Sequence, residues 1–84
     1  MDTDSGVATK VRQLVSDVLG VPFDSVQRES SYLNVEGWDS FNIVRLVMAA
    51  EVEFRVSISP DDALRFTSVE EIISFLESKG VVVR

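Results

Sequence analysis

The sequence predicts an all-α protein: a four-helix bundle with one very short helix and a long loop between the first two helices. Two observations carry this prediction. Apolar residues recur at helical spacing in three stretches, and each stretch follows residues that can cap a helix N-terminus. Residues 20–39, between the first two stretches, have no such period. The chain has 84 residues, 45% of them hydrophobic, so we expect one domain spanning residues 1–84.

The first helix is predicted from about Asp4 to Leu19. Its apolar residues follow a helical period: Val7, Val11, Leu14, Val15 and Val18. Thr3, Asp4 and Ser5 are candidate N-caps, and Gly20 followed by Pro22 is a typical stop signal. The expected helix therefore begins on a polar cap and ends at a glycine.

The segment from Gly20 to Asp39 is predicted to be a loop that apolar side chains pin to the core, with a helical turn near Asp24 to Val26. Its apolar residues are scattered rather than periodic: Phe23, Val26, Tyr32, Leu33 and Val35. A connection this long in a small domain is unusual, so the segment is either functional or wrongly assigned as a loop.

The second helix is predicted from Ser40 to Phe54, the most apolar run in the chain. At about 100° per residue, one face collects the expected core residues: Ile43, Leu46, Val47, Ala50 and Phe54. A separate apolar cluster, Phe41, Met48 and Val52, falls next to Arg45. The helical wheel leaves two possibilities open for this cluster: it packs inside the bundle, or it forms an exposed strip for a partner.

The remainder contains a linker and two further helices. Residues 55–58 read as a linker, and Ser59 followed by Pro60 opens a helix of one or two turns that Thr67 ends. Ser68 with Glu71 three residues later matches a capping box. The last helix has an apolar stripe and is closed by Lys79 and Gly80; the stripe is Val69, Ile72, Ile73 and Leu76.

Composition excludes several functions. The net charge of −6 argues against binding to nucleic acid and to anionic membranes. The chain has no cysteine and no histidine, which removes disulfides, thiolate metal sites and the commonest general base. No metal-binding or phosphate-loop motif is present, so we expect neither a metal site nor an enzyme with catalytic residues. The N-terminus lacks signal-peptide features and no apolar run could span a bilayer, so we expect a soluble, cytoplasmic protein without membrane insertion.

Ser40 is the candidate functional residue. Asp39 directly precedes the second helix and can accept from its unpaired backbone N–H groups. Ser40 would then lie at the positive end of the helix dipole, where a phosphate ester is favoured. From the residues alone, Asp39–Ser40 before an apolar helix is far more often an ordinary cap than a modification site.

Taken together, these stretches resemble the acyl carrier protein family. The resemblance rests on Gly37–Trp38–Asp39–Ser40–Phe41 in place of the family's Asp-Ser-Leu signature, on the apolar second helix ending at Phe54, and on Thr67–Ser68–Val69 opening the last helix. It implies that a separate transferase esterifies Ser40 with 4′-phosphopantetheine from coenzyme A. The thiol of this arm would carry an acyl or aminoacyl group as a thioester. Asp39 would cap the helix and help present Ser40.

The resemblance also implies partners: a phosphopantetheinyl transferase, and acyl-activating and acyl-transferring enzymes acting on a monomeric carrier. The residues expected to contact them are Trp38, Phe41, Arg45, Met48, Glu51 and Val52. Arg45 and Val52 occupy positions that are often acidic in fatty-acid-synthesis carriers, and Trp38 is similar to the residue in stand-alone carriers of dedicated operons. We therefore expect a dedicated pathway rather than housekeeping fatty-acid synthesis, with less charge steering of partners.

Other interpretations remain open at this point. An unmodified helical interaction module would use the cluster of Phe41, Met48 and Val52 to bind a partner, with Ser40 only part of a cap. A peptidyl or D-alanyl carrier would be modified at Ser40 as well and would differ in the enzyme that loads it. An excised domain of a megasynthase is a further alternative, although we expect a free-standing protein.

Overall fold

The structure is a computed structural model that describes residues 6–82, and this part of the chain is helical without strands. Its elements are α1 (Gly6–Leu19), a 3-10 turn η1 (Phe23–Ser25), α2 (Ser40–Phe54), α3 (Pro60–Ala63) and α4 (Val69–Ser78). This confirms the predicted all-α bundle with one short helix and a long loop after α1. The expected start of the first helix, at Asp4 with its candidate caps, lies outside the described residues.

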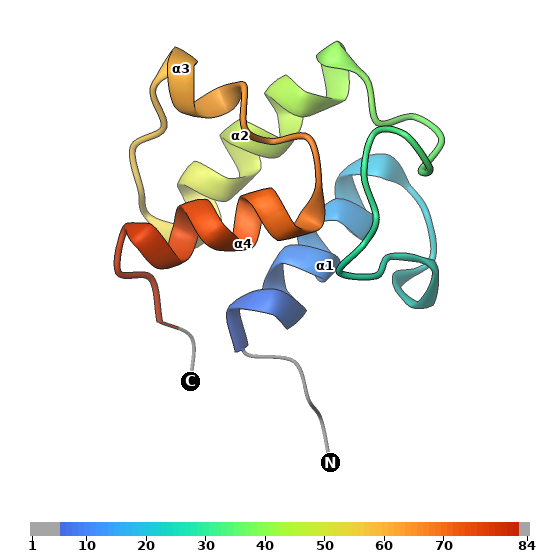
Figure 1. Ribbon diagram of the computed structural model, residues 1–84, viewed down its shortest axis with the longest axis horizontal. Coiled ribbons are helices and arrows are strands. Elements are labelled where there is room, and N and C mark those ends of the chain that lie inside the picture. The colour runs from blue at the N-terminus through green and yellow to red at the C-terminus, as the bar shows by residue number, and fades with distance from the viewer. Residues whose placement is uncertain (1–5, 83–84) are drawn as a thin grey trace.

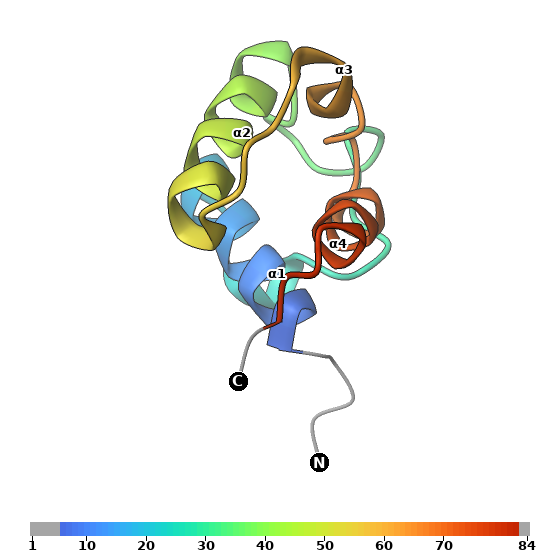
Figure 2. The same cartoon turned by 90° about the vertical axis from the view of Figure 1, so that its left-hand side faces the viewer.

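Helix α1 packs against both α2 and α4 (Figures 1 and 2). The short helix α3 packs against α2 at the end of the bundle where α2 begins. Helix α4 runs along the other side of α1, and Figure 2 shows α2 and α4 on opposite sides of the molecule. The start of α2 is therefore held between the long loop and the α3 region.

The core is built from one face of each long helix and from side chains of the connections. The helices contribute mainly aliphatic residues: Val7, Ala8, Val11 and Val15 from α1, Leu46 and Ala50 from α2, and Val69, Ile72, Ile73, Phe75 and Leu76 from α4. Three fully or almost fully buried side chains come from outside the helices, namely Val26, Trp38 and Phe66. Ile43, Val47 and Phe54 pack against this core, which confirms the predicted core face of α2.

Local signals explain where the helices begin and end. The Oγ atoms of Ser59 and Ser68 accept hydrogen bonds from the backbone N–H groups of Asp62 and Glu71. Gly20 ends α1 with a φ of +70°, a conformation that side chains disfavour, and its N–H donates to the carbonyl of Ser16. These contacts confirm the caps and the glycine stop expected from the sequence.

The long loop is attached to the bundle by fewer apolar side chains than expected. Val26 is fully buried and Val35 packs against the core, whereas Tyr32 and Leu33 are 55% and 78% exposed. Their expected role as anchors is wrong, because hydrogen bonds hold this part of the loop instead. The N–H of Tyr32 donates to the carbonyl of Thr67, and Ser30 accepts from the N–H of Val69 through its carbonyl.

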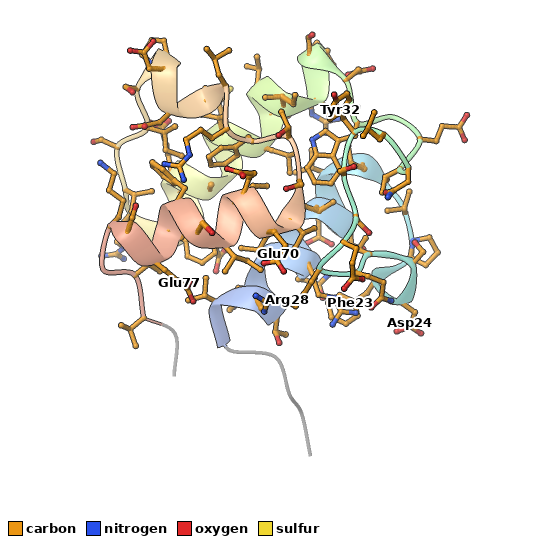
Figure 3. The ribbon with its side chains drawn as sticks, in the orientation of Figure 1. Phe23, Asp24, Arg28, Tyr32, Glu70 and Glu77 are labelled. Carbon is orange, nitrogen blue, oxygen red and sulfur yellow. The ribbon has the colours of Figure 1, made fainter. Side chains whose placement is uncertain are left out.

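Ionic and aromatic contacts add to the attachment of the loop. The Arg28 guanidinium makes a bidentate contact with the Glu70 carboxylate at 3.0 and 3.3 Å, and Figure 3 shows the two side chains facing each other. The Arg12 guanidinium lies 4.2 Å from the centre of the Phe23 ring, beside the turn η1. The loop therefore has a defined path from the end of α1 to the start of α2.

Candidate functional site

Ser40 is the first residue of α2 and is exposed. Asp39 precedes it in an extended conformation, and its Oδ1 accepts a hydrogen bond of 3.0 Å from the N–H of Asn42. Within residues 6–82, the N–H groups of Ser40 and Phe41 and the Ser40 hydroxyl have no hydrogen-bond partner. An exposed hydroxyl beside free N–H groups at a helix N-terminus suits a phosphate ester, so the residues present fit the phosphopantetheine group that the family resemblance implies.

Asn42 organises the junction between the loop and α2, a role that the sequence analysis did not assign to it. Its Nδ2 donates to the carbonyl of Gly37 at 2.6 Å, and its Oδ1 accepts from Nη1 of Arg45 at 3.0 Å. Gly37 has a φ of +89°, which only glycine adopts readily. A polar residue two positions after the serine, combined with this glycine, is the signal that could have revealed the role of Asn42.

Trp38 is buried, which contradicts the expectation that it lies on the partner-binding surface. Only 4% of its surface is exposed, and its Nε1 donates to the carbonyl of Phe66 at 3.1 Å. The indole therefore contributes to the core and ties the segment before α2 to the segment before α4. This contact anchors the residue directly before Asp39 and Ser40 in the core.

The outer face of α2 carries the expected apolar residues in exposed positions. Phe41, Met48 and Val52 are 73%, 61% and 81% exposed, and Arg45 beside them is exposed as well. The alternative that this cluster packs inside the bundle is thus excluded. Sequence reasoning missed Val44, which is 57% exposed on the same helix, because the helical wheel does not show where α3 leaves α2 uncovered.

The acidic residues of α2 make contacts within the chain. Glu51 is half-buried, and its Oε2 accepts from the N–H of Ile58 at 3.0 Å, so it holds the linker after α2 rather than standing free for a partner. Glu53 lies 3.4 Å from Nζ of Lys10 in α1. With Glu51 and Glu53 in contact with other parts of the chain, the exposed face of α2 carries mainly apolar side chains and the cation of Arg45, although the whole chain is acidic.

Two open depressions meet at Ser40. The first, of about 570 Å³, lies toward the long loop and is lined by Tyr32, Trp38, Asp39, Ser40, Ile43 and Thr67. The second, of about 310 Å³, lies toward α3 and is lined by Ser40, Ile43, Val44, Ala63, Leu64 and Thr67. A group attached to the Ser40 hydroxyl therefore has a polar-edged surface on one side and a mainly apolar one on the other.

No catalytic group is assigned to this site. The chain has no histidine, and both of its lysines make contacts away from Ser40. Lys10 pairs with Glu53, and the Lys79 ammonium lies 5.5 Å from the Phe75 ring centre. In the part of the chain that the structure describes, no cluster of acidic side chains could hold a metal ion. In the same residues, no helix has both the length and the hydropathy needed to cross a membrane.

Replacing Asp39 should measurably destabilise α2. We expect Asp39→Ala to lower the free energy of unfolding by about 1 kcal/mol, because the N–H of Asn42 loses its acceptor. Asp39→Asn should stay closer to the wild type, since asparagine keeps a side-chain oxygen at the cap. Urea denaturation followed by circular dichroism measures both variants. Equal destabilisation by alanine and asparagine would mean that the cap is not what Asp39 contributes.

Comparison with known proteins agrees with the geometry of the site. A family model described as "Phosphopantetheine attachment site" matches residues 9–76. The chain is similar to an acyl carrier protein of Bdellovibrio bacteriovorus, with 42% identity over 71 residues that cover 84% of this chain and 91% of the relative. It is also similar to an acyl carrier protein of Solidesulfovibrio magneticus, with 40% identity over 73 residues that cover 87% of this chain and 94% of the relative.

Proposed function

The chain belongs to the acyl carrier protein family, and from this premise we propose that Ser40 is the residue that carries its phosphopantetheine arm. As a member of this family it is a carrier protein rather than an enzyme, and its cofactor is 4′-phosphopantetheine. One observation supports Ser40 above all others: its hydroxyl is exposed at the N-terminus of α2 beside unpaired backbone N–H groups. When bound, the arm supplies a thiol that holds acyl groups as thioesters.

The proposed loading reaction requires only a presented hydroxyl from this chain. A bond forms between Oγ of Ser40 and the pantetheine-bearing phosphorus of coenzyme A, the phosphoanhydride bond breaks, and adenosine 3′,5′-bisphosphate leaves. The serine proton passes to a base of the transferase or to solvent, because this chain contributes no histidine. Asp39 and Asn42 hold the backbone on either side of Ser40, so this residue keeps its place at the start of α2.

An intact-mass measurement separates this function from an unmodified interaction module. We expect incubation with coenzyme A, magnesium and a broad-specificity phosphopantetheinyl transferase to add the mass of one phosphopantetheine. An unmodified module with the same exposed strip would bind a partner through Phe41, Met48 and Val52 but would gain no mass. A peptidyl or D-alanyl carrier would gain the same mass, and a panel of activating enzymes would identify it by which of them loads the thiol.

We further propose that Phe41, Val44, Arg45, Met48 and Val52 form the docking strip for partner enzymes in a dedicated pathway. The support is the exposed apolar surface beside Ser40 and its local charge, since Arg45 is cationic and Glu51 and Glu53 contact other parts of the chain. Such a strip favours apolar contact over long-range attraction to basic partners. We also propose that the protein is cytoplasmic and monomeric. Analytical ultracentrifugation tests the monomeric state.

Reversing the charge in the docking strip should weaken partner binding. We expect Arg45→Glu to lower kcat/KM for loading by the host's phosphopantetheinyl transferase several-fold, because the change removes the contact with Asn42 and places a carboxylate among apolar residues. Lys79→Glu is the matched control, with the same charge change on an exposed residue after α4. Equal kinetics for both variants would remove Arg45 from the strip.

A further inference from the structure

The depression on the loop side of Ser40 has a composition that its neighbour toward α3 lacks. It is lined by the chain's only tyrosine and only tryptophan, Tyr32 and Trp38. The depression toward α3 shares Ser40, Ile43 and Thr67 but is otherwise lined by aliphatic side chains. Ser40 lies on the boundary, so a group attached to it can reach either surface.

The two walls of the loop-side depression are tied to each other by backbone contacts. The N–H of Tyr32 donates to the carbonyl of Thr67 at 3.0 Å, and the N–H of Val69 donates to the carbonyl of Ser30 at 2.9 Å. Between these bonds, Ser31 and Ser68 form an isolated antiparallel bridge. The surface is therefore built before any ligand arrives, and Figure 3 shows Tyr32 close to the N-terminal turn of α2.

The side chain of Tyr32 is exposed even though its backbone is bonded to Thr67. Tyr32 is 55% exposed, while the almost fully buried Trp38 lines the depression and donates its indole N–H to the carbonyl of Phe66. An exposed aromatic side chain therefore lines the same depression as Ser40. Within residues 6–82, no side-chain hydrogen bond of Tyr32 or Thr67 is present, so both hydroxyls can bind a ligand.

The chemistry of a phosphopantetheine arm matches these groups. The arm has two methyl groups on one carbon, a hydroxyl and two amides, so it needs an apolar surface and hydrogen-bonding partners side by side. Tyr32 and Ile43 offer the apolar surface, and the Tyr32 and Thr67 hydroxyls offer donors and acceptors. The depression toward α3 lacks the tyrosine and suits a purely apolar group better.

We propose that Tyr32 and Thr67 hold the arm of Ser40 against the long loop when no partner enzyme is docked. This inference rests on the proposed attachment at Ser40. Covalent attachment gives the arm a high effective concentration at the depression, so weak contacts are enough to hold it there. A docking enzyme would compete with Tyr32 for the arm. Tyr32 would therefore help to determine how readily the arm leaves the surface of the carrier and enters the enzyme.

Nuclear magnetic resonance of the loaded protein tests this directly. The protein is labelled with ¹³C and ¹⁵N, the arm comes from unlabelled coenzyme A, and intact mass confirms complete loading first. We expect nuclear Overhauser effects between the arm's methyl protons and the ring of Tyr32, and a shift of the Trp38 indole N–H resonance on loading. Each reporter is unambiguous because the chain has one tyrosine and one tryptophan.

Two variants provide the matched comparison. Tyr32→Ala removes the ring but keeps the backbone bond to Thr67, so we expect loss of the arm's methyl contacts to the remaining residues of the depression, and of the Trp38 indole shift, with retained fold and loading. Leu33→Ala changes the neighbouring loop residue, which is 78% exposed and does not line the depression, and should keep them. A third variant, Thr67→Val, should weaken the contacts while leaving the Tyr32 ring in place.

The outcomes separate this inference from the attachment proposal. Absence of loading at the mass step would contradict the proposed function. Complete loading with methyl contacts to Val44 and Leu64 would overturn the loop-side inference, because it would place the arm in the depression toward α3. Complete loading without contacts beyond the residues next to Ser40 would overturn it as well, since the arm would then extend into solvent.

Discussion

Ser40→Ala is expected to abolish loading with phosphopantetheine completely while the fold stays intact. The hydroxyl is the group that would form the ester, and no other group of the chain replaces it at the start of α2. Stability should change little, because the Ser40 side chain is exposed and makes no hydrogen bond within the described residues. Intact mass measures the loading, and circular dichroism with thermal denaturation measures the fold.

Ser74→Ala is the matched control for this experiment. Ser74 is also an exposed helical serine, but it lies in α4, away from the depressions at Ser40. It should load like the wild type. Residual loading of well-folded Ser40→Ala protein would mean that another residue accepts the arm, and unfolding of this variant would contradict an exposed Ser40.

Trp38→Ala should have the largest effect on stability of the substitutions near the site. Removing a buried aromatic side chain costs about 3–5 kcal/mol, which approaches the roughly 4–13 kcal/mol expected for the whole domain from its length. Trp38→Phe should cost about 1–3 kcal/mol, partly because the carbonyl of Phe66 loses its donor in a buried position. Guanidinium denaturation followed by far-ultraviolet circular dichroism measures both changes without relying on tryptophan fluorescence.

Phe41→Ala provides the comparison for Trp38, since it removes an aromatic side chain that is 73% exposed only a few residues away. We expect this change to stay within about 0.5 kcal/mol of the wild type. If Trp38→Ala were no more destabilising than Phe41→Ala, the indole would not be part of the core. The pair of variants therefore tests whether Trp38 belongs to the core and not to the partner-binding surface.

The helices and their caps could be predicted from the sequence because their signals are local. Asp39, Ser59 and Ser68 each accept from a backbone N–H a few residues later, so the residue type and its spacing to the following helix carry the information. The bounds of α2, Ser40–Phe54, agree with the prediction for this reason. The exposed serine at the start of α2 followed from the same local argument.

The burial of the loop residues could not be predicted because it depends on partners far along the chain. Trp38 packs in a core built from segments far along the chain, where the carbonyl of Phe66 satisfies its buried indole N–H. Tyr32 is held by its backbone bond to Thr67 and its side chain is exposed. No period within residues 20–39 contains this information. Leu33 shows the opposite error, since an apolar residue in a loop was expected to be an anchor and is exposed.

The exposure of the docking strip could not be predicted either, because it depends on how the helices pack together. The wheel separated Phe41, Met48 and Val52 from the core face but gave no reason to choose between burial and exposure. The structure excludes burial because α2 packs on α1 along one side and meets only the short helix α3 on another. The role of Glu51 was missed for the same reason, since its acceptor function toward Ile58 depends on the path of the linker.

The central claim, that Ser40 carries the arm, is tested most directly by locating the modification within the loaded protein. Trypsin cleaves after Arg28 and Arg45, and the peptide between them contains three serines, Ser30, Ser31 and Ser40. Ser30 is buried and its Oγ accepts from Gln27, and the Oγ of Ser31 accepts from Leu33, so neither hydroxyl is presented like that of Ser40. Fragmentation of this peptide by tandem mass spectrometry should place one phosphopantetheine on Ser40 alone. An arm on Ser30, on Ser31 or outside this peptide, or no arm on well-folded protein, would contradict the account.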